Sequence, residues 1–231
     1  MVFTGKGYII AEIERNLRLL DPLGISALKR ELPCLYPSQN DNRHVGKILF
    51  EREILNQEKM AAIAPGSVWN TKRWPAERFA ELAGMLSAAG YEVLIIGGRD
   101  DMELGKTIVE HARDKHIHDT TGTLSLLQSA ELIGRCKVLI TNDSAPLHIG
   151  VAMKTPVAAI FGATAPEFGF GPYGEHDVVI ETKGLECRPC AIHGGDRCPI
   201  KTFVCMKNIE AAAVFQKVEQ MVRTNPANKP A

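Results

Sequence analysis

The sequence predicts an α/β fold, a Rossmann-like doubly wound parallel sheet, because three observations agree. From residue 60 onward, short apolar runs typical of buried strands alternate with longer segments of helical periodicity. Two of these runs, residues 60–64 and 137–141, are followed at once by polar segments. Each polar segment leads into a helical pattern, and the carboxyl ends of parallel strands share one edge of such a sheet. We therefore expect both polar segments to face one crevice.

The composition is that of an ordinary globular protein of one to two domains. Of 231 residues, 45% are hydrophobic and 23% charged, and 27 Lys and Arg balance 27 Asp and Glu. No basic tract suits a nucleic acid, so nucleic-acid partners are not expected. No apolar run reaches the roughly 18 residues of a membrane span, and the first residues lack the pattern of a secretory signal. A cytoplasmic location is expected.

Residues 1–58 are the least regular part of the chain. Apolar residues at helical spacing predict a helix over residues 11–20, which Asp21 and Pro22 would end. Residues 33–44, rich in Pro, Ser, Asn and Asp, predict a loop, and residues 45–57 predict a second helix. Such a segment is too short to form a domain alone.

The first polar segment, residues 65–75 (PGSVWNTKRWP), has the features of an anion-binding loop. Gly66 is expected to turn the chain with a positive φ, and Pro75 suits the first helical position. Lys72 and Arg73 bring two cations beside the start of that helix, and further hydrogen-bonding groups come from Ser67, Asn70 and Thr71. A phosphate would be favoured there. The alternative is a capped turn with solvated cations.

The elements that follow alternate between helix and strand. The predicted helices cover residues 75–89, 99–113 and 125–136, and the predicted strands cover residues 91–96, a short run near 117, 138–141 and 157–161. Gly97 and Gly98 predict a turn, and Ser125 with Gln128 predicts a capping box. Right-handed crossovers between these strands would give a doubly wound sheet.

The second polar segment, residues 142–148, resembles the first in its position after a strand. Ser144 is expected to cap a helix, with Pro146 in its first turn. His148 lies one turn further on, where its ring would contact a phosphate or sugar, or form a hydrogen bond within the core.

Two segments near the end of the chain complete the expected fold. Residues 162–174 predict a loop over the crevice, whose aromatic residues would either stack on a ligand or pack against the domain: Phe168, Phe170 and Tyr173. A last amphipathic helix is predicted over residues 208–221, with Asn208 as its cap, followed by a frayed tail.

Four of the six cysteines are close together in the sequence. Cys187, Cys190, Cys198 and Cys205 follow the spacing C-x2-C-x7-C-x6-C. Four thiolates suit a structural zinc ion, but these spacings match no established zinc motif, so inert or redox-sensitive thiols are the preferred interpretation. No metal site is expected, and the cysteines are weak candidates only.

Several of these motifs together resemble one family. They are PGSxWxTKRWP, a GG turn, a G-x-x-S-L segment and NDSAPLHIGVAMKTPVAAIFGAT. This spaced set resembles the C-terminal half of the ADP-heptose:lipopolysaccharide heptosyltransferases, inverting GT-B glycosyltransferases of family 9. The resemblance covers about residues 13–222, and the late cysteines are similar to those of the heptosyltransferase II branch.

The resemblance implies roles for individual residues. Lys72 would stabilise the leaving group, Asp143 and His148 would lie beside the donor sugar and phosphates, and Asp101 would bind the ribose. The alternative is a structural role for Asp101, because an acidic side chain at the start of a helix complements the helix dipole. The full set of substrate-binding residues that it implies is Ser67, Val68, Lys72, Asp101, Leu124, Asp143, Ser144, Ala145 and His148.

The resemblance also implies how the chain is organised. Residues 1–58 would be the end of an N-terminal Rossmann domain with the interdomain connection, residues 59–223 the nucleotide-sugar-binding domain, and residues 224–231 a flexible tail. The aspartate that acts as general base in the N-terminal half of this family has no match here. The chain alone is therefore expected to bind its donor without transferring the sugar.

The implied partners are a nucleotide sugar and the lipopolysaccharide core. Peripheral contact with the cytoplasmic face of the inner membrane would follow from such an acceptor. No cofactor is implied beside the donor substrate, ADP-heptose. A nucleotide-sugar-binding fragment without activity, or a GT-B transferase that uses another nucleotide sugar, are the alternatives.

Overall fold

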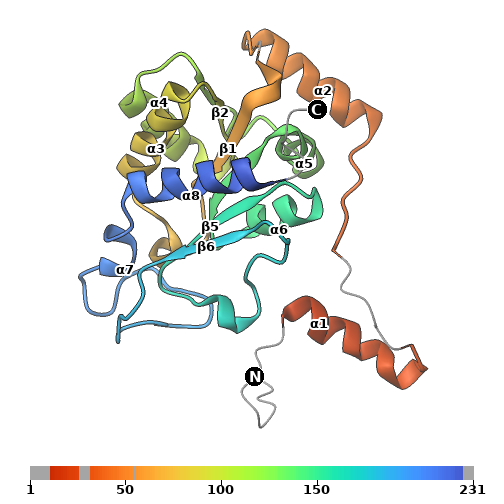
Figure 1. Ribbon diagram of the computed structural model, residues 1–231, viewed down its shortest axis with the longest axis vertical. Coiled ribbons are helices and arrows are strands. Elements are labelled where there is room, and N and C mark those ends of the chain that lie inside the picture. Colours follow the sequence, from red (N-terminus) through yellow and green to blue (C-terminus); the bar gives the residue numbers. More distant parts are fainter. Residues whose placement is uncertain (1–10, 26–31, 55, 226–231) are drawn as a thin grey trace.

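Six parallel strands form one sheet in the order β3-β2-β1-β4-β5-β6, in a computed structural model that describes residues 11–25, 32–54 and 56–225 (Figure 1). The strands are β1 (Met60–Ala64), β2 (Glu92–Ile95), β3 (Ile117–Asp119), β4 (Val138–Asn142), β5 (Val157–Phe161) and β6 (Val178–Glu181). This order reverses direction between β1 and β4, as in a doubly wound fold, so the predicted fold class is confirmed.

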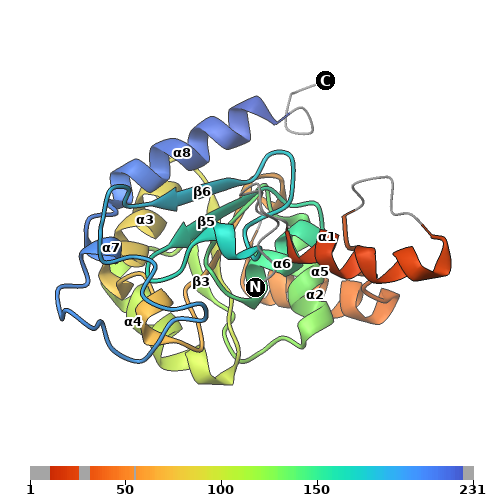
Figure 2. The ribbon, with the colours of Figure 1, turned by 90° about the horizontal axis from the view of Figure 1, so that it is seen from below.

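Helices cover both faces of the sheet. The α-helices are α1 (Glu12–Leu17), α2 (Gln39–Glu51), α3 (Ala76–Ala88), α4 (Met102–Ala112), α5 (Leu126–Arg135), α6 (Ala145–Ala152), α7 (Val204–Lys207) and α8 (Ala211–Thr224). Short 3-10 helices are η1 (Arg18–Leu23), η2 (Gln57–Lys59), η3 (Asn70–Lys72), η4 (Arg99–Asp101) and η5 (Pro166–Phe168). Helices α3, α4 and α8 pack on one face, and α2, α5 and α6 on the other (Figure 2).

The alternation of side chains along the central strands explains these two layers. In β1, Ala61 and Ile63 belong to the core under α3, α4 and α8, whereas Met60, Ala62 and Ala64 belong to the core under α2, α5 and α6. All five residues are buried, as expected for a central parallel strand with helices on both sides. The small side chains of β1 let both helix layers approach the sheet.

The first part of the chain departs from prediction at two places. Asp21 and Pro22 do not end the first helix, because the chain continues as the 3-10 helix η1 up to Gly24, which is left-handed. The predicted loop over residues 33–44 is wrong after Ser38, which caps α2 through a reciprocal hydrogen-bond pair with Asp41. A capping box therefore overrides the loop-like composition of this segment.

Further differences lie in the last third of the chain and at Pro75. Neither β6 nor α7 was predicted. Asn208 does not cap the last helix, since it follows α7, and α8 begins only after Glu210. Pro75 occupies the N-cap of α3 rather than its first helical position. Of the predicted tail, Thr224 still belongs to α8, Asn225 is buried, and residues 226–231 lie outside the described part.

Within the described ranges, none of the helices is both long enough and apolar enough to cross a membrane.

Candidate functional site

The loop after β1 is fixed to β4 by one buried amide. The Asn142 side chain, which has no exposed surface, donates through Nδ2 to the carbonyl oxygen of Pro65 at 2.7 Å. Its Oδ1 accepts a hydrogen bond from the backbone N–H of Trp74 at 3.0 Å. The two ends of the loop are thereby held against the same strand end. The ligand loop is positioned by a residue that the sequence prediction did not single out.

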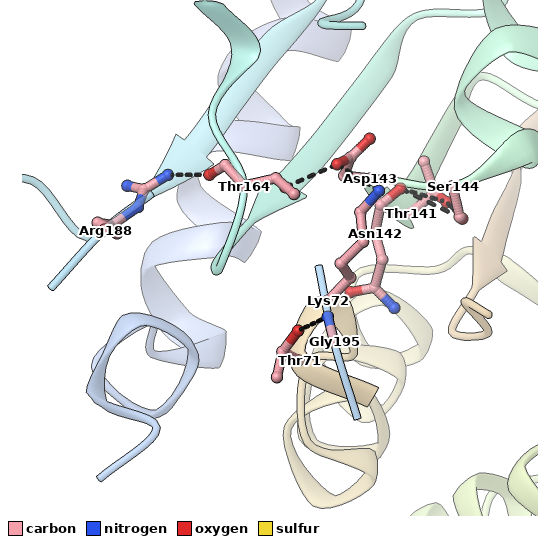
Figure 3. Close-up of polar contacts among 9 residues, drawn as sticks. All are labelled: Thr71, Lys72, Thr141, Asn142, Asp143, Ser144, Thr164, Arg188 and Gly195. Atoms are coloured by element: carbon pink, nitrogen blue, oxygen red, sulfur yellow. Dashed lines mark hydrogen bonds and ion pairs between the residues drawn. The ribbon is translucent and has the colours of Figure 1, made fainter. Parts of the chain in front are cut away.

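The loop places Lys72 beside Asp143 (Figure 3). The Lys72 Nζ atom lies 2.7 Å from Asp143 Oδ2, and the two side chains are only 14% and 8% exposed. The hydroxyl of Thr164, which follows β5, donates to the same carboxylate at 2.7 Å. The ends of β1, β4 and β5 thus contribute to one polar cluster. Its ammonium and carboxylate charges balance each other.

Gly66 serves a different purpose from the one predicted. It does not have a positive φ. A Cβ atom at this position would instead collide with the carboxylate of Asp101, and a Cβ at Gly97 would lie 2.7 Å from Asp101 Cβ. Asp101 also accepts a hydrogen bond from the N–H of Gly98 at 2.9 Å. The glycines after β1 and β2 therefore make room for Asp101 at the sheet edge.

A cavity of about 550 Å³ lies beside this carboxylate. Its walls are mainly apolar, with Ala64, Ile96, Leu124, Leu126, Ile133 and Ile149 among them. Polar groups along its rim come from Ser67, Arg73, Asp100, Asp101 and Ser144. Val68 also lines the cavity, although its side chain is 84% exposed. A flat apolar group with a polar edge, such as a nucleoside, matches this lining.

A second cavity, of about 320 Å³, lies on the side of Lys72 and Asp143. The other residues that line it are Ser144, Ala145, His148, Thr164, Ala165, Phe168, Phe170, Ile192 and His193. Ser144 and Ala145 line both cavities. Since these two residues begin α6, the two cavities meet at the N-terminus of that helix. An anion at this junction would be stabilised by the helix dipole and by the backbone N–H of Ala145, since Pro146 has no N–H and that of Leu147 donates to the Ser144 carbonyl oxygen at 3.1 Å.

All nine predicted substrate-binding residues line one cavity or the other. Ser67, Val68, Asp101 and Leu124 line the larger cavity, Lys72, Asp143 and His148 line the smaller one, and Ser144 and Ala145 line both. One detail of the prediction is wrong. Ser144 occupies the N-cap position, but its hydroxyl contacts Thr141 Oγ1 and the Asn142 carbonyl at 3.4 Å instead of capping α6.

His148 lines the smaller cavity and is exposed to solvent, although protein atoms surround part of its ring. Burial of its ring lowers its pKa below the usual histidine value, while Asp143 acts in the opposite direction and Lys72 lowers the pKa further. The neutral imidazole is therefore favoured at neutral pH. A neutral ring both donates and accepts a hydrogen bond, which suits a hydroxyl group.

The aromatic residues of the loop after β5 have two different environments. Tyr173 is 7% exposed and donates its hydroxyl hydrogen bond to Glu14 of α1 at 2.9 Å. It packs against the domain, one of the two predicted alternatives. Phe168 and Phe170 are half-buried and line the smaller cavity, where a ligand would contact them.

The six cysteines are free thiols. In the described part of the chain, no three or more His, Cys, Asp or Glu side chains gather in a way that would hold a metal ion. Burial and the neighbouring cysteines raise the pKa of Cys190 and Cys205, whereas backbone N–H groups, that of Phe203 above all, lower the pKa of Cys198. Of these three thiols, Cys198 ionises most readily.

Several residues of the site were missed by sequence reasoning. They are Asn142, Thr164, Arg188 and His193. Asn142 directly follows the apolar run of β4, which was the available signal. The other three lie in segments without helical or strand periodicity, so no local pattern marked them.

Known proteins resemble most of this chain. The family model for glycosyltransferase family 9 (heptosyltransferase) matches residues 11–196. Lipopolysaccharide heptosyltransferase 2 of Escherichia coli K12 is 30% identical over 163 residues, which is 68% of this chain and 47% of that protein. Lipooligosaccharide heptosyltransferase 2 of Campylobacter jejuni strain 81116 is 29% identical over 182 residues, 76% of this chain and 56% of that protein.

Solved structures show the same fold. A family 9 glycosyl transferase from Veillonella parvula matches with a TM-score of 0.79 and 25% identity, over 95% of this chain and 62% of that one. The E. coli ADP-heptose lipopolysaccharide heptosyltransferase II matches with a TM-score of 0.73 and 24% identity, over 96% and 64%. The chain spans about half the length of the curated relatives it matches. Because the family model covers most of its residues, the chain belongs to glycosyltransferase family 9, the heptosyltransferase family.

Proposed function

We propose that this chain is the donor-binding half of an inverting heptosyltransferase. It binds ADP-heptose, and the heptose is transferred to a hydroxyl of the lipopolysaccharide inner core. The observation that carries this proposal is that an apolar cavity and a polar cavity meet at the N-terminus of α6. The curated relatives named for heptosyl transfer to lipopolysaccharide or lipooligosaccharide support it.

The two cavities divide the donor between them. The adenosine occupies the larger, mainly apolar cavity, with its ribose hydroxyls towards Asp101. The diphosphate lies at the junction, against the backbone N–H of Ala145 and the positive end of the α6 dipole. The heptose occupies the smaller cavity, beside Lys72, Asp143 and His148.

This arrangement supplies what the departure of ADP needs. In the transfer, the bond between the anomeric carbon and the diphosphate oxygen breaks, and its electron pair stays on ADP. The acceptor oxygen forms the new bond to that carbon, and its proton goes to a general base. The charge that develops on ADP is stabilised by Lys72 and by the N-terminus of α6, without a metal cofactor.

The general base and the acceptor site belong to the part of the enzyme that this chain does not match. GT-B transferases react in the cleft between two Rossmann domains, and the chain spans about half the length of its curated relatives. Residues 1–58 are then the end of the N-terminal domain with the interdomain connection, and residues 59–223 are the donor domain. The second candidate function is a protein that binds the nucleotide sugar but does not transfer it. It is favoured by the same observation, that the chain matches only about half the length of its curated relatives.

The acceptor determines where such an enzyme acts. The lipopolysaccharide core is built on a membrane lipid, so we place the enzyme at the cytoplasmic face of the inner membrane, in peripheral contact with it.

Calorimetric titration with ADP, AMP and ADP-heptose tests the donor assignment. ADP should bind about tenfold or more tightly than AMP, because the second phosphate gains charge-assisted hydrogen bonds at the junction. ADP-heptose should bind at least as tightly as ADP, and UDP and GDP more weakly. Equal affinity for AMP and ADP would contradict the diphosphate site, and preference for UDP or GDP would point to another nucleotide sugar.

A transfer assay tests whether the 231 residues are sufficient for transfer. With labelled ADP-heptose and a truncated lipopolysaccharide acceptor, the 231-residue chain should bind the donor but release no labelled product. Loss of a general base alone removes about 10²- to 10⁴-fold in rate. Measurable transfer would mean that a base lies within these residues, and Asp143 and Asp101 would be the first to substitute.

A further inference from the structure

The segment of residues 188–195, which we call the strap, is tied to the ends of two different strands. At one end, Arg188 Nη2 donates to the carbonyl oxygen of Thr164 at 2.8 Å, and the Cys190 N–H donates to that of Ala163 at 2.8 Å. At the other end, the Gly195 N–H donates to Thr71 Oγ1 at 2.8 Å (Figure 3). The Thr71 N–H donates back to the Gly195 carbonyl oxygen at 3.0 Å. The strap therefore spans from the end of β5 to the loop after β1.

The strap packs against the Lys72 side chain close to its Gly195 end. Gly194 has a φ of +91°, and a Cβ atom there would lie 3.0 Å from both Cγ and Cδ of Lys72 and 3.1 Å from Cβ of Trp69. Such distances are too short for an ordinary contact, so the backbone approaches the lysine as closely as only a glycine allows. The strap thus fixes the stem of Lys72 while its ammonium group reaches Asp143.

Between these two anchors, His193 lines the smaller cavity. Ile192 lies beside it, and the same cavity is lined by Lys72, Asp143 and His148. Among the residues that the structure describes, none forms a hydrogen bond or an ion pair with the ring of His193. Asp143, in contrast, is already engaged by Lys72 and Thr164. The ring of His193 is therefore available to donate a hydrogen bond to a ligand in the cavity, or to accept one from it.

The chemistry of this cavity fits a sugar better than a phosphate. Its ammonium and carboxylate form a pair, and the neutral form of His148 is favoured, so beside Lys72, which the proposed function assigns to the β-phosphate, the lining residues offer no lysine or arginine to a further phosphate. Phe168 and Phe170 offer apolar surface to the C–H face of a sugar ring. The phosphates have the N-terminus of α6 at the junction of the two cavities.

We propose that His193 binds the sugar of the donor, through a hydrogen bond between its ring and a hydroxyl group. The assignment rests on the proposed function and deepens it, since it names a further residue that recognises the sugar. The ligand is the pyranose ring of a nucleoside-diphosphate sugar. This assignment also gives the strap, which contains Cys190, a role: it holds His193 over the donor.

The test compares ADP and ADP-heptose binding by calorimetry for the parent chain and for His193→Ala. The substitution should weaken ADP-heptose about three- to tenfold, the range of one neutral hydrogen bond, and change ADP affinity less than about twofold. His193→Gln, which keeps a donor and an acceptor, should recover part of the loss. His176→Ala is the matched control, because His176 is exposed and lines a different cavity.

The outcomes separate this inference from the proposed function. Equal ADP-heptose affinity in His193→Ala and parent would overturn the role of His193 and leave donor binding intact. An equal loss for ADP and ADP-heptose would overturn the sugar assignment, because the ring would then act on the phosphates. If the parent chain bound neither nucleotide, both proposals would fall. Because His193 is exposed, the fold should be unaffected, and matching unfolding temperatures would establish this.

Discussion

The Lys72 ammonium lies 2.7 Å from the carboxylate of Asp143, in a position where both side chains are largely buried. Lys72 lies in η3, in the loop after β1, whereas Asp143 directly follows β4 and precedes the serine at the N-cap of α6. The ion pair therefore sets the position of the lysine before any ligand arrives. Removing either partner should have a different effect on nucleotide binding.

Lys72→Ala should weaken ADP binding by about 1.5 to 3 kcal/mol, the scale of a hydrogen bond to a charged group. AMP binding should change less, because the β-phosphate is the group nearer the lysine. Calorimetry at one fixed ionic strength measures both affinities. If Lys72→Ala bound ADP as tightly as the parent, the lysine would have no part in holding the diphosphate.

Asp143→Asn should act in the opposite direction on ADP. Without the carboxylate, Lys72 keeps its full charge for the phosphates, so ADP affinity should be unchanged or higher. The free energy of unfolding should fall by about 1 to 3 kcal/mol, because Lys72 and Thr164 lose a charged acceptor in a partly buried site. Urea unfolding and calorimetry on the same preparation measure the two effects. Weaker ADP binding would mean that Asp143 positions Lys72 for the diphosphate rather than competing with it.

Local sequence patterns were sufficient for the central elements of the fold. The bounds of β1 and β5 were predicted as residues 60–64 and 157–161, because short apolar runs between polar loops are typical of buried parallel strands. β6 was missed because it is an edge strand of only four residues and is incompletely buried. Its apolar content alone does not distinguish it from the loops on either side.

The sequence indicated which loops form the site, but not the hydrogen bonds that join these loops to one another. Polar residues after β1 and β4 marked the ligand loops, and parallel topology brings such loops together. The bond from Asn142 to Pro65 joins residues 77 positions apart, and that from Gly195 to Thr71 spans 124. Contacts of this kind leave no periodic signal in the sequence. Gly66 was predicted to form a left-handed turn, and this reason was wrong, because the glycine instead leaves room for the Asp101 side chain.

Gly66→Ala tests this close approach. Its Cβ would collide with the Asp101 carboxylate, so the free energy of unfolding should fall by about 1 to 3 kcal/mol, the usual cost of overpacking. ADP binding should weaken as well, since Asp101 lines the nucleoside cavity. Urea unfolding and calorimetry measure the two changes.

Gly84→Ala is the matched control for that substitution. Gly84 lies within α3, and a Cβ there would have no other atom within 4 Å. The change should raise the free energy of unfolding by about 0.5 to 1 kcal/mol through helix propensity. Destabilisation by both substitutions alike would indicate a general intolerance of alanine, and not the loss of space for Asp101.

The lowered pKa of His148 predicts a dependence of stability on pH. Burial disfavours the protonated ring in the folded chain, while the unfolded chain protonates near the ordinary histidine value of about 6.5. Below that pH the unfolded state binds a proton that the folded state does not bind. The contribution of His148 is therefore fully present above about pH 6.5 and decreases as the pH falls towards its folded-state pKa.

His148→Gln removes this contribution. The difference in unfolding free energy between parent and variant should shrink on acidification from about pH 7.5 to about pH 5, because other titrating groups cancel in the difference. Urea unfolding at several pH values measures it. A difference that grows in acid would mean that the folded chain favours the protonated ring.

Asn142→Ala should be the most destabilising of these substitutions. The side chain is fully buried, and its loss leaves the Pro65 carbonyl and the Trp74 N–H without their partner. An unsatisfied buried polar group costs about 1 to 3 kcal/mol, so the loss should total about 2 to 5 kcal/mol. The loop that carries Lys72 would also lose its attachment to β4, and ADP binding should weaken even where the chain still folds. Tryptophan fluorescence during urea unfolding reports the change, because Trp74 is only 1% exposed.

Asn70→Ala is the control on the same loop, since Asn70 is exposed and its substitution should shift stability by less than about 0.5 kcal/mol. If the two variants unfolded at the same urea concentration, the buried amide would not be what fixes the loop to the sheet.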